Sequence, residues 1–288
     1  MDMMNGLEAM GLGGLDADNL YGEKKSAPHH APVKEEPKKT KLSATDEKDL
    51  IFDKSYECPV CSRAFTAKTV RTGKVHTVRF DYDLRPVYDV LDQVKYEVVA
   101  CPNCGYSVLL RYHGSVSDKQ CKILRDTIGA KFHPQTWSTD LYSYEEAKLR
   151  YQLALANAMA RNAKASEKAY ICLKTAWLLR GEQESFAQAG GNEEKIKASR
   201  ESELKYLGQA LDGFEQARQT ENFPVAGMDD KTLDYVMSAL YLSQGRYQDC
   251  ARFLGSILMS KNITKNLRTK AEDLKAMLTE EMKKNKPI

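Results

Sequence analysis

The fold is decided by two short stretches, Cys-Pro-Val-Cys at residues 58–61 and Cys-Pro-Asn-Cys-Gly at residues 101–105. Two residues between the cysteines let both thiolates of one tight turn face a single tetrahedral metal ion, and two such turns complete a site. The four predicted metal ligands are Cys58, Cys61, Cys101 and Cys104. Because cysteine fills every position, no place remains for a catalytic water, and the metal is expected to be structural.

Zinc is the expected ion, and iron is the alternative, because residues 104–106 (Cys-Gly-Tyr) resemble the turn of a rubredoxin. A disulfide framework is not expected. The N-terminus carries no positive charge before Lys24, and glycines and acids interrupt its apolar residues, so it does not resemble a secretory signal. The expected compartment is the cytoplasm, where thiols stay reduced.

The segment between the two cysteine pairs, residues 62–100, is predicted to form β structure. Strand-forming residues lead into the second pair at 96–100 and away from it at 107–112. A strand, a metal-binding turn and a second strand are what a zinc ribbon needs, and Gly105 suits a turn in which φ is often positive. We therefore expect a zinc-ribbon-like domain over residues 50–115.

Residues 83–88 (Asp-Leu-Arg-Pro-Val-Tyr) form a dense cluster of polar and aromatic residues inside this segment. Two interpretations are equally supported by the sequence. The cluster is either a binding surface or the turn that caps the ribbon.

Three further cysteines lie outside the two pairs. Each falls on the apolar side of a predicted helix, and free cysteine is commonly a small buried hydrophobic residue. The cysteines expected in the core are Cys121, Cys172 and Cys250.

The composition of the 288-residue chain is that of a globular protein with about two domains. Its 43 Lys and Arg residues against 40 Asp and Glu residues give a net charge of +3, which is not the strong basic excess of a dedicated nucleic-acid binder. A hydrophobic content of 42% supports real cores. No apolar run approaches the length needed to span a membrane, so a soluble protein is expected.

The N-terminal residues precede both predicted domains. Residues 1–21 are acidic, with spaced apolar residues from Met4 to Leu20 and four glycines that weaken any free helix. This segment is either a disordered tail or a short motif that docks in a groove, of a partner or of this protein's own helices. Residues 22–49 are rich in Lys, Glu, Pro and Ala, and they are predicted to form a disordered linker.

From Ser117 onward the apolar residues recur at helical spacing, which predicts a mostly α-helical domain over residues 116–288. Gly181 is expected to end one helix and to begin a glycine-containing insertion that reaches Gly191. The helices predicted here cover residues 117–129, 144–158, 170–181, 193–220 and 267–278.

Residues 240–251 join two more helices through a Gln-Gly-Arg-Tyr corner, in a pattern that resembles the tetratricopeptide (TPR) helix-turn-helix unit. Ser238 and Cys250 take the positions where the two helices touch, although Cys250 replaces the usual alanine. A weaker unit precedes this one, and the last helix would cap the stack, as terminal repeats require. The predicted fold is therefore α+β and mostly α, with a zinc-ribbon-like domain followed by a TPR-like helical repeat domain.

The order of several motifs resembles a bacterial family of uncharacterised proteins, DUF2225, over residues 50–285. The motifs are the CPxC turn followed by Phe65, the run Asp83-Leu84-Arg85-Pro86, the strand at 96–100 that leads into CPNCGY, and Lys174-Thr175-Ala176-Trp177-Leu178-Leu179-Arg180. The resemblance implies a cytosolic bacterial protein with a zinc-ribbon-like domain and TPR-like helices. It implies no activity, because none is assigned to the family.

The leading interpretation of function is a non-enzymatic scaffold or adaptor that binds a protein or peptide partner through its TPR-like helices. The alternative is binding of nucleic acid or a ribonucleoprotein through a basic face of the ribbon, where aromatic rings would stack on bases. The low net charge disfavours this alternative. The residues of that face are Lys68, Arg71, Lys74, Arg79, Arg85 and Arg111, with Phe80, Tyr82 and Tyr88.

No catalytic residues are predicted. The sequence contains no Ser-His-Asp or Cys-His order with a supporting motif, no phosphate-binding glycine loop and no HExxH. A second alternative to the scaffold is thiol redox chemistry or metal sensing by the CxxC pairs. The sequence indicates neither the oligomeric state nor the identity of the partner.

Overall fold

Three two-stranded antiparallel hairpins form the β structure of this computed structural model, which describes residues 3–17, 20–21, 46–137 and 140–284. The hairpins are β1 (Ile51–Glu57) with β2 (Ala64–Val70), β3 (Thr77–Phe80) with β4 (Pro86–Tyr88), and β5 (Val98–Ala100) with β6 (Ser107–Leu109). The β structure predicted between the cysteine pairs is therefore confirmed. Two strands are shorter than predicted, because a 3₁₀ turn at Gln93–Tyr96 precedes β5 and another at Leu110–Tyr112 follows β6.

The rest of the described chain is mostly helical, which confirms the α+β, mostly α class. The α-helices are α1 (Asp118–Leu124), α2 (Tyr144–Ala160), α3 (Ala165–Gln188), α4 (Glu193–Thr220), α5 (Asp230–Ser243), α6 (Tyr247–Met259) and α7 (Lys265–Lys284). A π-helical turn, Arg125–Gly129, extends α1 to the glycine at which the sequence predicted its end. None of the helices in the described ranges is long and apolar enough to cross a lipid bilayer.

Polar caps explain where several helices begin. The Ser117 hydroxyl accepts the backbone N–H of Gln120, and the Gln120 side chain accepts the backbone N–H of Ser117, which completes a capping box. Ser143, Asn192 and Asp229 each accept a backbone N–H three residues further along, at the starts of α2, α4 and α5. Each cap satisfies a backbone donor that the first helical turn leaves free.

The prediction that a helix ends at Gly181 is wrong, because α3 continues to Gln188. A Cβ atom at position 181 would collide with the Asp92 carboxylate and would lie 2.9 Å from the Tyr144 hydroxyl. The Tyr144 hydroxyl donates a hydrogen bond to Asp92 (3.1 Å) directly beside the helix. Gly181 therefore marks a close approach of this pair to α3, and the predicted insertion is reduced to the turn at residues 189–192.

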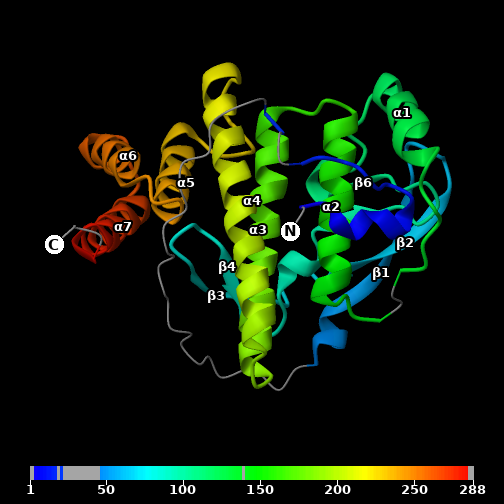
Figure 1. Ribbon diagram of the computed structural model, residues 1–288, viewed down its shortest axis with the longest axis horizontal. Helices are drawn as coiled ribbons and strands as arrows, with labels where there is room; N and C mark the ends of the chain where they lie inside the picture. The colour runs from blue at the N-terminus through cyan, green and yellow to red at the C-terminus, as the bar shows by residue number, and fades with distance from the viewer. Residues whose placement is uncertain (1–2, 18–19, 22–45, 138–139, 285–288) are drawn as a thin grey trace.

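Helix α2 packs between the β5–β6 hairpin and α3, to the right of α3 in Figure 1. Every residue from Arg150 to Ala158 is buried, as expected of a helix with neighbours on all sides. One apolar core runs without interruption from the cysteine turns through α2 and α3 to Leu278 of α7. The boundary between two domains at residues 115 and 116 stays a prediction. It coincides with the change from β to α elements along the chain, but the apolar core extends across it.

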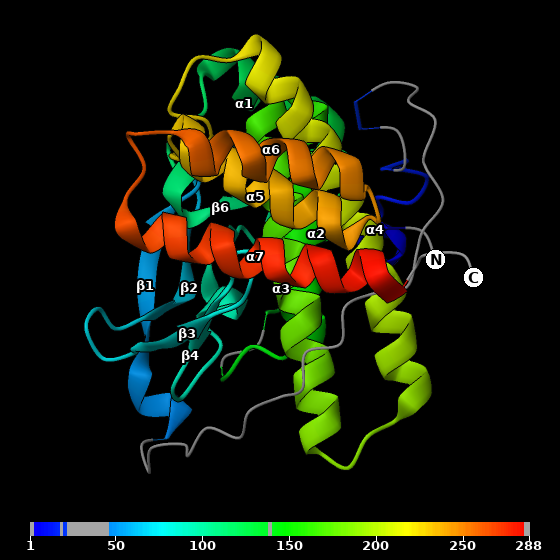
Figure 2. The ribbon, with the colours of Figure 1, turned by 90° about the vertical axis from the view of Figure 1, so that its left-hand side faces the viewer.

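The helix-turn-helix predicted at residues 240–251 is present, with Gly245 at a φ of 70° in the corner between α5 and α6. Ser238 and Cys250 are both fully buried. Helix α7 packs against α6 and α5, at the end of the row of helices (Figure 2). The relationship of these hairpins to TPR units stays a prediction.

The N-terminal residues lie against the helices, and of the two alternatives for residues 1–21 the described part follows the docking one. Residues 3–17 pack beside α2, and their contacts are described further below. Most of the predicted linker, residues 22–45, lies outside the described residues. Its last residues were wrongly assigned to the linker, because Glu47–Leu50 forms a 3₁₀ turn that leads into β1.

Candidate metal centre

The two cysteine pairs occupy the turns of two separate β-hairpins. Glu57 pairs with Ala64 at the closed end of β1–β2, and Ala100 pairs with Ser107 at the closed end of β5–β6. Each Cys-Pro-x-Cys stretch spans the turn beyond such a pair. Strand pairing therefore fixes the backbone on both sides of every ligand pair.

The two turns have the same backbone hydrogen-bond pattern. In the first, the N–H of Ser62 donates to the Cys58 carbonyl (2.8 Å), and in the second, that of Gly105 donates to the Cys101 carbonyl (3.2 Å). The donor residue has a positive φ in both turns, 57° at Ser62 and 72° at Gly105. This pattern turns the backbone beneath the sulfurs, as a metal-binding turn requires, and it confirms the positive φ expected at Gly105.

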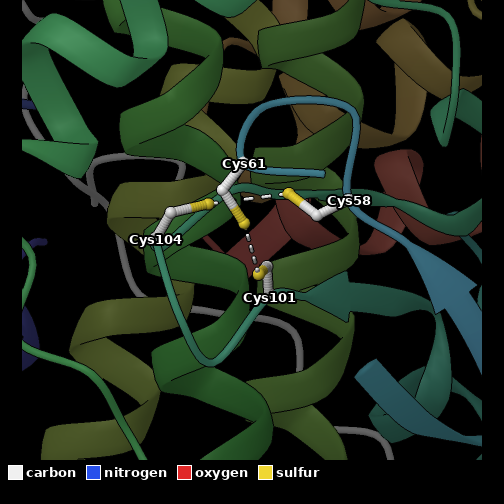
Figure 3. Close-up of side chains that lie close together, drawn as sticks. All are labelled: Cys58, Cys61, Cys101 and Cys104. Atoms are coloured by element: carbon white, nitrogen blue, oxygen red, sulfur yellow. Dashed lines mark hydrogen bonds between the residues drawn. The ribbon is translucent and has the colours of Figure 1, made fainter. Parts of the chain in front are cut away.

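The four predicted ligand residues come together. Their sulfur atoms all lie within 4.8 Å of one another, and among the described residues they form a compact group that could hold a metal ion (Figure 3). The Sγ atoms of Cys58 and Cys104 are 3.5 Å apart, and those of Cys61 and Cys101 are 3.8 Å apart. Four sulfurs at about 2.3 Å from a tetrahedral zinc ion lie about 3.8 Å from one another, so the donor set fits such an ion.

The cysteine side chains of the group influence one another's ionisation. Hydrogen bonds from Cys104 and Cys58 lower the pKa of Cys101 to about 2. The hydrogen bond with Cys101 raises the pKa of Cys58 to about 12, and the same partner raises the pKa of Cys104. One thiolate is therefore favoured at the expense of its neighbours, and a bound divalent cation is what would let all four ionise.

Side chains from distant elements hold both cysteine turns in place. Asn157 of α2, which is fully buried, donates through Nδ2 to the Gly105 carbonyl (2.8 Å). Arg125 donates through Nη2 to the Val60 carbonyl (2.9 Å) in the other turn. The Phe132 ring covers Gly105 so closely that a Cβ there would lie 2.5 Å from a ring carbon. Such supporting contacts fix the orientation of metal ligands.

Sequence reasoning missed these supporting residues. The available signal was an asparagine inside the apolar run of residues 153–158, where a polar side chain needs a buried partner. The three other cysteines are buried, as predicted, and belong to the apolar core. Burial raises the pKa of Cys250 to about 12, which keeps that thiol protonated and inert.

The predicted basic face of the ribbon does not form a set of free cations. Lys68 pairs with Asp53 (3.0 Å), and Arg79 pairs with Asp81. Two more of the predicted cations contact helical parts of the chain or the loop beyond them. Arg85 pairs with Glu184 (2.7 Å), and Arg111 donates to the Ala226 carbonyl (3.1 Å). Arg71 also donates to the Asp49 carbonyl (3.1 Å), so acidic or carbonyl oxygens already bind five of the six predicted cations.

The predicted polar cluster at residues 83–88 is buried at its centre, and it belongs to the turn between β3 and β4. The Asp81 N–H donates to the Arg85 carbonyl (2.9 Å), and Leu84 has a φ of 67°. Asp81, Asp83 and Arg85 are each at most 3% exposed. The turn interpretation therefore holds, and the surface interpretation is wrong for Asp83 and Arg85.

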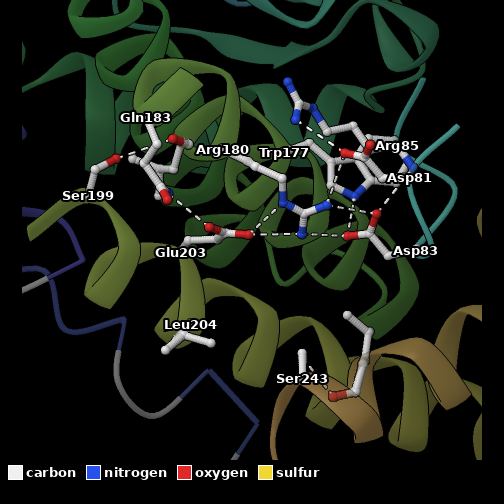
Figure 4. A network of polar contacts seen from close by, with 12 residues as sticks. Asp81, Asp83, Arg85, Trp177, Arg180, Gln183, Ser199, Glu203, Leu204 and Ser243 are labelled. Atoms are coloured by element: carbon white, nitrogen blue, oxygen red, sulfur yellow. Dashed lines mark hydrogen bonds and ion pairs between the residues drawn. The ribbon is translucent and has the colours of Figure 1, made fainter. Parts of the chain in front are cut away.

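This turn is held by a network of buried charges from α3 and α4 (Figure 4). The Arg180 guanidinium binds both oxygens of Asp83 (3.0 and 2.8 Å) and also contacts Asp81 (3.2 Å) and Glu203 (2.8 Å). Burial alone would raise the pKa of Asp83, but the charge and hydrogen bonds of Arg180 outweigh burial and hold that pKa below its usual value. These charges are paired with one another and act as structural links.

The same hairpin reaches two further helices. The Tyr235 hydroxyl of α5 donates to the Tyr82 carbonyl (2.7 Å), and Lys270 of α7 lies over the Phe80 ring (4.9 Å). Together with Arg180, these contacts place the β3–β4 hairpin against α3, α5 and α7 (Figure 2). One face of the helical stack is therefore already occupied by the protein's own β structure.

The fold and the site define a class of protein in which a four-cysteine centre, built from two hairpins, is packed onto a stack of helices. The sequence model of the DUF2225 family, described as uncharacterised proteins conserved in bacteria, matches residues 51–278, and the chain belongs to this family. No curated protein and no solved structure gives a significant match.

Proposed function

We propose that the four cysteines hold one structural zinc ion, which fixes the two cysteine turns against α2. The support is the sulfur spacing, the all-thiolate donor set and the buried hydrogen bond from Asn157 to the second turn. A closed set of four protein ligands leaves no open position for a substrate. A zinc ion bound in this way contributes directly to folding, as in other small metal-stabilised modules.

Elemental analysis of the purified protein tests this assignment. We expect one zinc per chain, lost in Cys104→Ser but kept in the matched control Cys250→Ala, whose side chain lies elsewhere in the core. Cobalt exchanged into the site should give the thiolate-to-cobalt and tetrahedral absorption bands of a four-sulfur centre. Iron in place of zinc, or metal retained in Cys104→Ser, would contradict the proposal.

We further propose that the protein is a non-enzymatic cytoplasmic scaffold that binds a partner protein through its helices. The observation that carries this proposal is a groove of about 460 Å³ between α4, α5 and α6. We call it the arginine groove. Its floor includes Met237, Tyr241 and Phe253, and its rim includes Arg218, Arg246 and Arg252.

The arginine groove combines apolar and cationic groups in a way that suits a protein segment. The guanidinium carbons of Arg218 and Arg252 lie 5.4 and 5.5 Å from the Phe253 ring centroid, and that of Arg246 lies 4.5 Å from the Tyr241 ring. A guanidinium held against a ring keeps N–H donors free for a carboxylate. The groove thus favours a partner segment that carries an acidic residue beside an apolar one.

The charges already present limit how much of this surface is available. Arg218 pairs with Asp234 (2.6 Å) and Arg246 pairs with Glu215 (2.9 Å). Arg252 pairs with Asp249, but its side chain is 70% exposed. A partner could therefore bind Arg252 with less disruption of existing ion pairs than binding Arg218 or Arg246 would cause.

An affinity pull-down from a bacterial cytosolic extract, with and without nuclease, tests the scaffold proposal. The tagged wild-type protein is compared with Phe253→Ala and Arg252→Glu, and with Lys275→Glu on the exposed side of α7 as the control. We expect nuclease-resistant partners whose recovery falls in both groove variants and not in the control. Recovery that nuclease abolishes would favour nucleic-acid binding, and equal recovery in all variants would overturn the assignment of the groove.

A further inference from the structure

The N-terminal segment, residues 3–17 and 20–21, packs on the protein much as a bound peptide does (Figure 1). It forms a 3₁₀ turn at Asn5–Met10 beside α2. Its apolar side chains enter the common core, and Leu7 is completely buried. The buried apolar residues of the segment are Met3, Met4, Leu7, Met10, Leu12, Ala17 and Leu20.

The protein binds the backbone of this segment as well as its side chains. Gln152 of α2 and the Tyr206 hydroxyl of α4 both donate to the Met3 carbonyl, at 2.8 and 2.6 Å. The backbone N–H of His133 donates to the Met10 carbonyl (3.0 Å), and Lys168 of α3 donates to the Leu20 carbonyl (3.0 Å). Donors spaced along a groove that bind main-chain carbonyls are a means of recognising a linear peptide.

Two glycines of the segment lie where no side chain would fit, and they help to define its sequence pattern. A side chain at Gly6 would collide with Leu149 and Gln152 of α2, and one at Gly11 would collide with the Lys131 carbonyl oxygen. Gly11 also has a φ of 80°, which other residues rarely adopt. With the buried Leu7, Met10 and Leu12, these positions define the pattern Gly-Leu-x-x-Met-Gly-Leu.

The segment lies outside the part of the chain that the family model matches. The family model matches residues 51–278, so the elements that form the groove lie within it, and the segment that fills the groove does not. Residues 22–45 separate the segment from Asp46. A covalent tether of this length reaches at most about 80 Å, so the segment can leave the groove and remain attached.

We propose that this groove, formed by α2, α3, α4 and residues 131–133, is a docking site for linear peptides with the pattern Gly-Leu-x-x-Met-Gly-Leu. The chain's own N-terminal segment is its resident occupant, and a partner protein that carries the same pattern displaces it. The site is separate from the arginine groove, so its failure would leave the scaffold proposal standing. Because the resident segment belongs to the same chain, its binding is intramolecular, and a partner must compete with its effective concentration.

The test cuts the tether after folding. A protease site introduced within residues 22–45 releases the segment from the folded full-length chain, and a fluorescent peptide of residues 1–21 is then added. We expect fluorescence anisotropy to rise on the cut protein and to rise at least about ten-fold less on the uncut protein at the same peptide concentration, because the tethered segment competes. Mass spectrometry should show the native segment leaving as the labelled peptide binds.

Matched peptides and one variant of the protein show whether the observed contacts determine which peptides bind. Peptides with Leu7→Asp or Gly11→Val should fail to bind, whereas Glu8→Gln, at an exposed position where the pattern allows any residue, should bind as the parent does. In the protein, Tyr206→Phe keeps the ring and removes the donor to Met3, and it should speed peptide release several-fold. A segment that stays on the cut protein against excess peptide, or equal binding of the Gly11→Val peptide, would overturn the proposal.

Discussion

Trp177 and Asp83 are 94 positions apart in the sequence, and the indole Nε1 of Trp177 donates a hydrogen bond to Oδ2 of Asp83 at 3.1 Å. Arg180, almost one helical turn further along α3, binds both oxygens of the same carboxylate. Two motifs that identify the family are thus in direct contact. The contact joins the β-rich part of the chain to the helices inside a continuous core.

Removal of either charge of the Asp83–Arg180 pair should destabilise the protein strongly. We expect Arg180→Met to lower the free energy of unfolding by about 3–5 kcal/mol, because it leaves the buried Asp83 carboxylate without the guanidinium that binds both of its oxygens. Asp83→Ala should cost less than Arg180→Met, because Arg180 keeps its contacts with Asp81 and Glu203. Denaturant unfolding of both single variants and the double variant measures the coupling. Lys48→Met, which breaks the exposed pair with Asp140, is the control and should change stability by less than about 1 kcal/mol. Additive effects of the two variants would contradict direct coupling.

The same pair predicts a loss of stability in acid. The pKa values of Asp83 and Glu184 are lowered in the folded protein, because paired arginines outweigh the effect of burial. A carboxylate of this kind stabilises the fold above its unfolded pKa of about 4, and the contribution disappears as pH falls through the lower folded pKa. The stability difference between wild type and Asp83→Asn should therefore shrink below about pH 4. Zinc release in acid affects both proteins alike, so a difference that stays constant would contradict the prediction.

Two glycines with similar backbone angles allow the cost of crowding at the four-cysteine site to be distinguished from the cost of backbone strain. Gly105 has a φ of 72° and lies under Phe132, whereas Gly73 has a φ of 74° and a Cβ there would meet no atom within 4 Å. We expect Gly73→Ala to cost about 1–2 kcal/mol from the left-handed backbone alone. Gly105→Ala should cost about 1–3 kcal/mol more, because Phe132 must move. Only the second variant should also retain zinc less tightly, as chelator competition would measure; equal costs would argue against crowding.

Asn157 should control how firmly zinc is held, although it does not contact the sulfurs. Asn157→Ala leaves the Gly105 carbonyl without its donor, and a lost buried hydrogen bond costs about 1–3 kcal/mol. Residues that support metal ligands typically change metal affinity by about 10–100-fold, so zinc should pass to a colorimetric chelator faster than from wild type. Glu145→Ala, on the exposed first turn of the same helix, is the control. Zinc transfer at an unchanged rate would show that strand pairing alone orients the second turn.

The four-cysteine cluster could be predicted because its geometry is local: two residues between cysteines fix both sulfurs on one turn. The supporting residues could not, since the role of Asn157 depends on how α2 lies against a turn 52 positions earlier in the chain. A similar limit applies to Gly181. A glycine within a helical pattern usually ends the helix, and only the arrival of Asp92 and Tyr144 beside α3 explains why this one does not.

The buried charges were misleading for a physical reason. Asp83 and Arg85 belong to residue types that are almost never fully buried unless paired, so the sequence supported a binding surface as strongly as a turn. Their partners, Arg180 and Glu184, lie about a hundred positions away on α3. The family resemblance identified both motifs but gave no indication that they meet.

A metal ion bound by the four cysteines would also close a ring in the chain. Cys61 and Cys101 are 40 residues apart, and the β3–β4 hairpin that contacts α3, α5 and α7 lies entirely within that ring. A cross-link across 40 residues removes chain entropy from the unfolded state equivalent to about 4 kcal/mol at 25 °C. A metal ion held by these cysteines would therefore influence helices that it does not touch, because it would limit the volume that the hairpin explores before Asp83 pairs with Arg180.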